Sequence, residues 1–381
     1  MANKHEIWEL RQMQSLPLQA KIQMTRQRIR SWIDEFGEDG VYVSFSGGKD
    51  STVLLDIVRK DYPNIKAVFI DTGLEYPQIR AFVKTYENVD IVRPSMNFRE
   101  VIVKYGYPII GKEVSQSLYE ARHLKEGKTK TLRLQQFLGG IDMQFMKDFT
   151  RYKFLLNAPF EISHMCCNVM KKSPAKKYAK KNHVTRIMAT MAEESKLRLT
   201  KWLREGCNSF ESKEPNSTPM SFWTEQDVLQ YIHENNLSIA DAYGQVVVKN
   251  DGVDGQINIH DVLGDYRGCQ YETTGCKRTG CIFCGFGITK DKQRFARLSE
   301  QEPKLCDYVM RGGEFNENGM WQPSKDGLGY WFVLEWLNVH GMKIGIPNRE
   351  HYMSEYQTEE TRKYLEKKRE WRNENEHRNN D

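Results

Sequence analysis

The sequence contains no cysteine before Cys166, although eight cysteines occur in the chain. It also lacks any apolar run that approaches the ~20 residues of a membrane-spanning helix. Residues 1–12 (MANKHEIWELRQ) lack the apolar stretch of a signal peptide. We therefore expect a cytoplasmic protein with no membrane partner. In such a reducing compartment, clustered cysteines are more often metal ligands or redox groups than disulfides.

A strong excess of one charge sign is absent as well. The 56 Lys and Arg residues against 51 Asp and Glu residues leave a formal net charge of +5. This balance permits an anionic ligand or a nucleic acid as partner and requires neither. A chain of 381 residues has room for more than one domain. We expect a helical segment over 1–37, a nucleotide domain over 38–240, a cysteine-bearing region over 241–358 and a charged tail over 359–381.

Residues 41–55 (VYVSFSGGKDSTVLL) are the segment around which the chain is organised. The pattern predicts a buried strand, a glycine-rich turn and the start of a helix. Glycines let a backbone approach an anion, and a helix N-terminus presents unpaired N–H groups. We interpret the segment as a phosphate cradle, and the alternative is a tight turn without a ligand. Its candidate nucleotide-binding residues are Ser44, Ser46, Gly47, Gly48, Lys49, Asp50 and Ser51.

The G-x-x-x-x-G-K-S/T spacing of the common P-loop is absent from this turn. The sequence SGGKDS over 46–51 instead resembles the SGGxDS loop of the ATP pyrophosphatases, or PP-loop enzymes. Those enzymes split ATP between the α- and β-phosphates, usually to adenylate a substrate. The resemblance implies ATP and Mg²⁺ as ligands, with Lys49, Asp50 and Ser51 as catalytic residues. The metal would neutralise the pyrophosphate leaving group.

A second polar segment, DTGLEYP over 71–77, follows the strand predicted at 65–70. Polar residues at the carboxyl end of a parallel strand line the ligand crevice of an open α/β sheet. The alternative is that Asp71 caps a helix with Pro77 in its first turn. The segment resembles the second motif of the phosphoadenosine phosphosulfate (PAPS) reductase family, which lies near the adenosine there. The resemblance implies that the nucleotide contacts Asp71, Thr72, Gly73 and Glu75.

Two later segments extend the resemblance. The strand predicted at 185–190 is followed by Glu194, Ser195 and Arg198, which fit a family pattern near the phosphates, G-x-R-x-x-E-S-x-x-R. Thr190 and Met191 depart from its Gly-x-Arg part, which contributes a phosphate contact in the family. Residues 219–228 (PMSFWTEQDV) resemble a structural segment of the family and predict a capped helix over 225–235.

The cysteines fall into two clusters. The sequence CCNVMKKSP over 166–174 resembles the CC-x-x-x-K-x-x-P segment of the family, and its Lys171 is a candidate anion ligand. The second cluster holds Cys269, Cys276, Cys281 and Cys284. Thiolates select zinc or an iron–sulfur cluster, and buried structural thiols are the alternative.

Two ligand sets compete for the metal. A local set of Cys269, Cys276, Cys281 and Cys284 would bind Zn²⁺ as a structural knuckle. A split set of Cys166, Cys167, Cys281 and Cys284 would hold a 4Fe–4S cluster. The split set matches the Cys-Cys and Cys-x-x-Cys ligands of iron–sulfur members of the family. We favour it, with Cys269 and Cys276 as alternates.

The resemblance runs from about residue 38 to 290 and implies a doubly wound, mostly parallel α/β sheet of the adenine nucleotide alpha-hydrolase-like kind. A smaller, mainly helical, cysteine-rich part would follow. The intact SGGxDS loop, and the absence of a Glu-Cys-Gly-x-His sequence, favour broad family members such as the sulfur-handling ATPase of DNA phosphorothioation over the sulfate-assimilation reductase.

The predicted activity is ATP-dependent adenylation that releases pyrophosphate, followed by sulfur transfer assisted by the cluster. One alternative is a PAPS or adenosine phosphosulfate reductase that uses the cluster and an external thiol. Another is a nucleotide-binding regulator without turnover. A sulfur donor or thiol reductant is the expected partner, and the acceptor is open between tRNA, DNA and a small molecule. An oligomer is compatible with the sequence.

Overall fold

The structure is a computed structural model of the chain. It describes residues 3–124, 131–139, 147–249 and 269–366. The chain divides into two compact units: unit 1 is Met1–Pro94 with Ser173–Cys281, and unit 2 is Ser95–Lys172 with Ile282–Asp381. Each unit therefore combines two separate segments, whereas the predicted boundaries divide the chain in order. The part of the predicted charged tail from residue 367 on lies outside the described residues.

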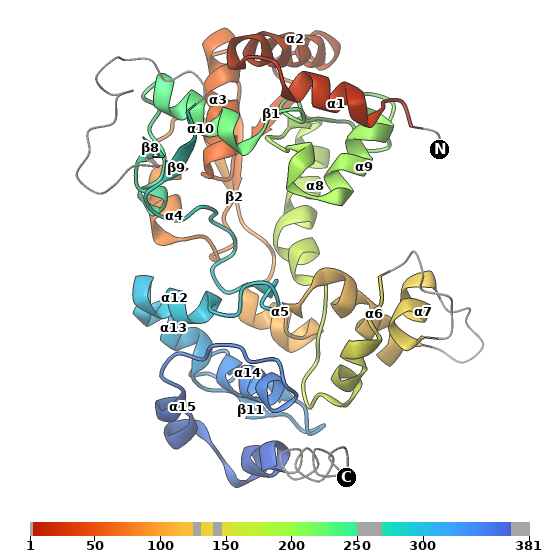
Figure 1. The fold of residues 1–381 in the computed structure, drawn as a ribbon, viewed down its shortest axis with the longest axis vertical. Coiled ribbons are helices and arrows are strands. Elements are labelled where there is room, and N and C mark those ends of the chain that lie inside the picture. The colour runs from red at the N-terminus through yellow and green to blue at the C-terminus, as the bar shows by residue number, and fades with distance from the viewer. Residues whose placement is uncertain (1–2, 125–130, 140–146, 250–268, 367–381) are drawn as a thin grey trace. The chain divides into compact units, whose positions relative to one another are not determined.

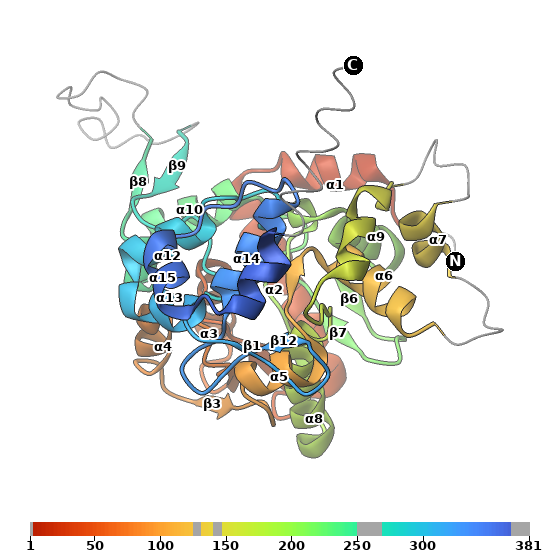
Figure 2. The same ribbon diagram turned by 90° about the horizontal axis from the view of Figure 1, so that it is seen from below.

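Unit 1 contains a six-stranded sheet of order β3-β2-β1-β5-β7-β6, of which Figure 1 labels β1 and β2. Its strands are β1 (Val41–Ser44), β2 (Ala67–Ile70), β3 (Val89–Val92), β5 (Thr185–Ile187), β6 (Asn208–Ser209) and β7 (Asn216–Ser217). All neighbouring pairs are parallel except β6 with β7, which lie side by side at one edge (Figure 2). The predicted α/β class with a mostly parallel sheet is confirmed.

Strand β1 lies in the middle of this sheet. Val43 pairs with Ala67 of β2 on one side and with Ile187 of β5 on the other. Residues 41–43 are all buried, as expected for a parallel strand that is covered on both faces. The chain order reverses direction at β1, because β2 and β3 lie on one side and β5 and β7 on the other. Ligands of open α/β sheets bind outside the carboxyl ends of the strands at such a switch point.

The helices of unit 1 are α1 (Ile7–Gln14), α2 (Leu18–Phe36), α3 (Lys49–Asp61), α4 (Pro77–Val83), α8 (Ser173–Asn182), α9 (Lys196–Glu205) and α10 (Glu225–Glu234). Two of these helices, α9 and α10, begin with side-chain caps, which are Ser195 and Thr224. The N-terminal helical segment is interrupted, because Pro17 forms the N-cap of α2. A hairpin of β8 (Val246–Val248) and β9 (Tyr271–Thr273) completes the unit.

The capped start predicted for the helix over 225–235 is confirmed. The Thr224 backbone N–H donates to Asp227 Oδ2 at 2.6 Å, and the Asp227 backbone N–H donates to Thr224 Oγ1 at 3.3 Å. Asp227 also receives the ammonium group of Lys21 at 2.8 Å from each carboxylate oxygen. Lys21 is 2% exposed, so this ion pair joins α2 to α10 inside the core of unit 1.

Unit 2 is mainly helical. Its helices are α5 (Phe98–Tyr105), α6 (Lys112–Arg122), α7 (Leu132–Leu138), a 3-10 helix (Thr150–Asn157), a π-helix (Asn168–Lys172), α12 (Arg294–Gln301), α13 (Pro303–Met310), α14 (Tyr330–Val339) and α15 (Arg349–Tyr356). Its short strands are β4 (Ile109–Ile110), β10 (Gly285–Phe286), β11 (Glu314–Phe315) and β12 (Trp321–Gln322). Figure 2 shows α12, α13 and α14 gathered together.

Helix α14 is the centre of unit 2. Nine of its ten residues are buried, including the aromatic side chains of Tyr330, Trp331 and Phe332. The only carboxylate in it, Glu335, is buried and accepts a hydrogen bond from Arg349 Nε at 2.7 Å. Among the described residues, no helix is both long and apolar enough to cross a membrane.

Replacing Lys21 by Met is expected to destabilise unit 1 by about 3 kcal/mol, because the Asp227 carboxylate stays buried without its cation. The measurement is urea unfolding followed by circular dichroism. Lys176→Met is the matched control, since the Lys176–Glu214 pair is half exposed at both ends. That change should cost less than about 1 kcal/mol. Equal effects of the two changes would contradict the role given to the buried pair.

Candidate functional site

The turn between β1 and α3 requires glycine at its first glycine position. Gly47 has a φ of 69°, which L side chains rarely adopt. A Cβ atom there would also lie 2.8 Å from Ile79 Cγ2 and 2.8 Å from Val83 Cγ2. Helix α4, which carries Ile79 and Val83, therefore packs directly on the turn.

Two serine hydroxyls brace the turn from within. Ser51 Oγ accepts a hydrogen bond from the Ser46 backbone N–H at 3.1 Å and donates to the Gly48 carbonyl at 2.9 Å. Ser46 Oγ accepts from the Gly48 backbone N–H at 3.3 Å. These contacts give both hydroxyls a structural role in the protein without nucleotide. Their part in nucleotide binding stays a prediction.

Gly48 marks a small recess at the start of α3. Its φ of −78° suits any residue, so conformation alone does not demand glycine there. A Cβ atom would lie 3.2 Å from Ser46 Oγ and 3.3 Å from the Tyr243 hydroxyl. A side chain would therefore fill the recess. Because α3 begins at Lys49, the positive end of the helix dipole faces this recess.

Lys49 lies in the site and is held by partners from distant segments. Its side chain is 4% exposed, and Nζ donates to Glu225 Oε1 and to the Lys277 carbonyl, each at 2.9 Å. Its backbone N–H donates to the Tyr243 hydroxyl at 3.4 Å. The Tyr243 hydroxyl in turn lies 2.5 Å from Thr279 Oγ1. The start of α3 is thus surrounded by α10, residue 243 and residues 277–279.

Asp50 carries an unsatisfied oxygen. Its Oδ1 atom is buried and has no hydrogen-bond partner among the described residues. Burial raises the pKa of Asp50 above its usual range, while the charge of Lys49 opposes the shift. A buried acceptor without a partner is costly unless a ligand completes it. Mg²⁺ is commonly bound by one or two carboxylates together with substrate phosphates, so Asp50 fits the predicted magnesium ligand.

Glu194, Ser195 and Arg198 lie together beside this loop. Glu194 forms an ion pair with Arg198 and accepts a hydrogen bond from the Met191 backbone N–H at 3.1 Å. Ser195 Oγ caps α9 by accepting from the Arg198 backbone N–H at 3.3 Å. Arg198 is close enough to Asp50 for their charges to affect each other's pKa. The Met191 side chain is buried, and because methionine is uncharged it adds no charge to the site.

The polar side chains of the segment over 71–77 form hydrogen bonds within the segment and with Arg80 of α4. Glu75 accepts hydrogen bonds from the Thr72 backbone N–H at 3.1 Å and from the Thr72 hydroxyl. Asp71 accepts from the Gly73 backbone N–H at 3.2 Å and from Arg80 at 3.0 Å. These bonds shape the turn into α4, which begins at Pro77. Adenosine contact by these residues stays a prediction.

Lys171 belongs to the other unit. It lies in the π-helix Asn168–Lys172 of unit 2, directly after the cysteine pair. The other predicted nucleotide-binding residues all lie in unit 1. The contact of Lys171 with the nucleotide stays a prediction.

Four residues of the loop environment were missed by the sequence analysis: Glu225, Tyr243, Arg278 and Thr279. Arg278 Nη2 lies 3.8 Å from Glu194 Oε2. Glu225 begins the capped helix α10, and its position was predicted without its contact. The sequence CKRTGC over 276–281 contains a basic pair, Lys277 and Arg278, which could have indicated a segment near an anion. Nothing local places that pair next to residue 49.

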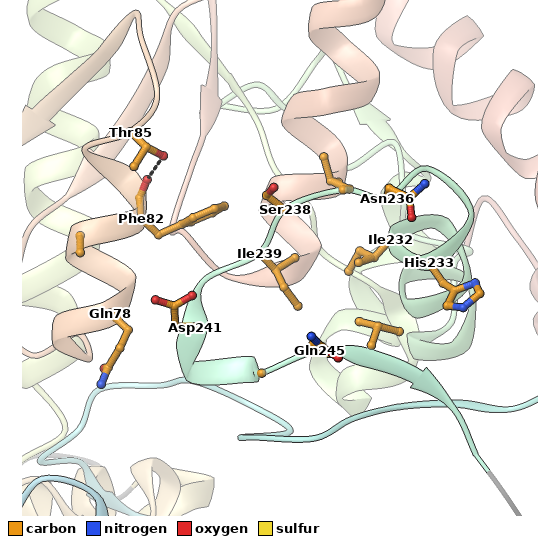
Figure 3. Close-up of a pocket in the computed structure, with 14 residues that line it drawn as sticks. Gln78, Phe82, Thr85, Ile232, His233, Asn236, Ser238, Ile239, Asp241 and Gln245 are labelled. Atoms are coloured by element: carbon orange, nitrogen blue, oxygen red, sulfur yellow. Dashed lines mark hydrogen bonds between the residues drawn. The ribbon is translucent and has the colours of Figure 1, made fainter.

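A cavity of about 870 Å³ lies beside α4 and away from the loop residues (Figure 3). Figure 3 shows Gln78 and Phe82 on one side of it and Ile239, Asp241 and Gln245 on the other. None of the predicted site residues lines it. Its wall at Asp241 belongs to the 3-10 turn Asp241–Tyr243, whose last residue reaches the phosphate loop.

The eight cysteines are divided between the two units and form no disulfide. Cys207, Cys269, Cys276 and Cys281 lie in unit 1, whereas Cys166, Cys167, Cys284 and Cys306 lie in unit 2. Within the described part of the chain, no three His, Cys, Asp or Glu side chains come close enough together to hold a metal ion. Each predicted ligand set draws cysteines from both units, and both sets stay predictions.

Two cysteines of the split set approach one tyrosine in unit 2. Gly285, which follows Cys284, pairs with Ile109 of β4. Two residues before Ile109, Tyr107 forms a bridge with Ile162 on the chain that leads to Cys166. The Tyr107 ring packs edge-on against Tyr330, at a centroid distance of 5.2 Å.

The Tyr330 hydroxyl lies in this region without a hydrogen-bond partner among the described residues. Burial raises the pKa of Tyr330 well above its usual range, and the nearby Cys284 and Cys166 thiols add to the rise. The Cys166 and Cys284 thiols and the Tyr330 hydroxyl thus lie in the same region of unit 2. The donor chemistry suits a thiolate-bound centre, although only part of a ligand set is present.

Two solved structures that match this chain do so with low similarity. The crystal structure of the phosphoadenylyl-sulfate (PAPS) reductase from Candida auris, a phosphate complex, aligns with 68% of this chain and 100% of its own, at 17% identity and a TM-score of 0.34. The FMN adenylyltransferase of Candida glabrata aligns with 65% of this chain and 73% of its own, at 9% identity and a TM-score of 0.34.

Comparison of sequences is more informative. Over 117 residues the chain is 32% identical to an uncharacterised protein of Methanocaldococcus jannaschii. The match covers 30% of this chain and 28% of that relative, so less than a third of the relative is spanned. The profile of the phosphoadenosine phosphosulfate reductase domain matches residues 40–148 and 141–285. Because this match includes the phosphate loop and more than half of the sequence, the chain belongs to the phosphoadenosine phosphosulfate reductase domain family.

Proposed function

We propose that this protein binds ATP at the loop over 46–51 and uses it to adenylate an acceptor, with release of pyrophosphate. The observation that carries the proposal is the buried Asp50 Oδ1 atom, which lacks a hydrogen-bond partner in the described part of the chain and lies beside a recess that a Cβ at Gly48 would fill. An anion in the recess and Mg²⁺ on Asp50 would satisfy both features. The SGGKDS sequence of the loop supports ATP as the nucleotide.

The proposed reaction is a displacement at the α-phosphorus. A nucleophilic oxygen of the acceptor forms a bond to that phosphorus, and the bond to the oxygen that bridges the α- and β-phosphates breaks. Pyrophosphate leaves with the bonding electron pair. Lys49 and Arg198 lie where positive charge can stabilise the polyphosphate. Lys49 would exchange Glu225 for a phosphate oxygen when ATP binds.

The second proposed step is sulfur transfer. The terminal sulfur of a persulfide donor attacks the activated carbon of the acceptor, the C–O bond to AMP breaks, and AMP leaves with the electron pair. A thiol reductant then attacks the donor sulfur of the resulting disulfide, the S–S bond breaks, and the thiolated acceptor leaves with the electron pair while donor and reductant are joined by a disulfide. We assign an iron–sulfur cluster to Cys166, Cys167, Cys281 and Cys284, supported by the region shared by Cys166, Cys284 and Tyr330. A bound cluster would supply iron-bound sulfide or electrons. Neither step above depends on it.

A second candidate function is the reduction of a sulfonucleotide. The description of the matched family favours it, as does the grouping of Cys166 with Cys284. An external thiol would then supply the electrons, and sulfite would form from PAPS. Detection of sulfite with PAPS, and of no AMP with ATP, would select this candidate over adenylation.

The protein with an acceptor-containing extract is expected to convert α-labelled ATP into AMP and pyrophosphate. Lys49→Ala should slow this conversion about 100-fold, because one charge that stabilises the transition state is lost. Thin-layer chromatography of the labelled AMP measures the rate of the wild-type protein and of the variant. Lys60→Ala, at the other end of α3, is the matched control and should retain the wild-type rate. ADP as the sole product would refute the proposed cleavage.

Asp50→Asn should raise the melting temperature of the protein without nucleotide and abolish the dependence of ATP binding on Mg²⁺. The raised pKa means that the charged carboxylate costs stability at neutral pH. The gain should disappear as the pH falls through that raised pKa, because protonation removes the same charge.

Asp61→Asn on the same helix is a control of opposite sign. The hydrogen bond from Arg26 lowers the pKa of Asp61, so its carboxylate stabilises the fold above its usual pKa. This change should lower the melting temperature. Calorimetry at several pH values measures both variants, and a fall in melting temperature for Asp50→Asn would contradict the assignment.

The cluster assignment predicts a brown protein after anaerobic purification. It should absorb broadly at about 400 nm, as thiolate-bound iron–sulfur clusters do. Cys167→Ser and Cys284→Ser should both remove the colour and the bound iron, whereas Cys269→Ser should retain them. A colourless protein with one zinc, lost in Cys269→Ser and kept in Cys167→Ser, would select the local ligand set instead.

A further inference from the structure

Arg278 is held beside the phosphate loop by anchors on both sides. The Lys277 carbonyl accepts a hydrogen bond from Lys49 Nζ at 2.9 Å. On the other side, Thr279 Oγ1 lies 2.5 Å from the Tyr243 hydroxyl, which itself accepts from the Lys49 backbone N–H. Both sequence neighbours of Arg278 are therefore connected to Lys49, the first residue of α3. Lys277 makes the contact directly, and Thr279 makes it through Tyr243.

The side chain of Arg278 is only weakly engaged. It is 61% exposed, and its guanidinium lies 3.8 Å from Glu194, at the outer limit of an ion pair. Glu194 already forms an ion pair with Arg198. One carboxylate is thus shared by two guanidinium groups.

The two arginines repel each other in the absence of an anion. Burial lowers the pKa of Arg198, the charge of Arg278 adds to that fall, and both arginines act on Asp50. Lys49 adds a third cation within the same region. Like charges held this close are stabilised when a polyanion binds between them. Lys49 is paired with Glu225, and the Asp50 and Glu193 carboxylates also act on these cations, so the observation specific to Arg278 is that it shares Glu194 with Arg198.

We propose that Arg278 is a further polyphosphate-binding residue that exchanges Glu194 for phosphate oxygens when ATP occupies the loop. The inference rests on the proposed binding of ATP. A guanidinium fork binds phosphate oxygens through two parallel hydrogen bonds, and an exposed side chain on a fixed backbone can reach them without refolding. Arg278 also lies between Cys276 and Cys281 in the sequence. Its contact would connect nucleotide binding to the cysteine segment.

The test compares variants that remove the same charge. Arg278→Ala is expected to weaken ATP and pyrophosphate binding about tenfold, the loss of one charge-assisted contact, and to leave adenosine binding unchanged. Arg204→Ala is the matched control, because Arg204 is an exposed residue in the last turn of α9. Isothermal titration with ATP, pyrophosphate and adenosine gives the three affinities. Arg278→Lys should recover part of the loss.

A measurement on the wild-type protein makes the test independent of how the variant folds. Phenylglyoxal modifies accessible arginines, and mass spectrometry follows Arg278. Pyrophosphate should protect Arg278 from modification, and adenosine should not. Equal modification with and without pyrophosphate would overturn the inference.

The outcomes separate this inference from the proposed function. If wild-type protein does not bind ATP, or Gly48→Ala binds it unchanged, the proposed function fails. If Gly48→Ala loses ATP but Arg278→Ala matches Arg204→Ala, only the role of Arg278 fails. If Arg278→Ala weakens ATP and adenosine equally, the residue is structural and the inference is wrong.

Discussion

The buried ammonium group of Lys49 is the constraint around which unit 1 is arranged. A charge that is 4% exposed needs nearby partners, and Glu225 and the Lys277 carbonyl supply them. One partner begins α10, and the other lies in the cysteine segment, 228 residues away along the chain. The phosphate loop, α10 and residues 277–279 are therefore held together by one side chain.

The charges around the loop are not balanced within the loop itself. Among the described residues Asp50 has an oxygen without a hydrogen-bond partner, and Arg198 and Arg278 share Glu194. Both features describe a site that an anion with a divalent cation would complete. Met191 stands where the family pattern has arginine, and Glu194 contacts both its backbone N–H and Arg278. The Arg278 guanidinium thus reaches the segment after β5 from another part of unit 1.

Unit 2 has a different organising feature. The short strand β4 pairs with β10, and the neighbouring Tyr107 bridges to Ile162. These two pairings carry the cysteines at 166 and 284 toward the buried hydroxyl of Tyr330. The adjacency of Cys166 and Cys167 in the sequence does not by itself provide this grouping. It depends on strands that are only two residues long.

The sequence by itself determined the elements whose causes are local. The helix predicted over 225–235 is α10, and Thr224 with Asp227 caps it, because capping acts within a few residues. The glycine-rich turn followed from Gly47 for the same reason. Only the tertiary structure decided that Tyr243 and Arg278 lie at the loop, and that Cys166 shares a region with Cys284. These contacts join segments that are distant in the sequence, which burial and charge pairing bring together and no local pattern records.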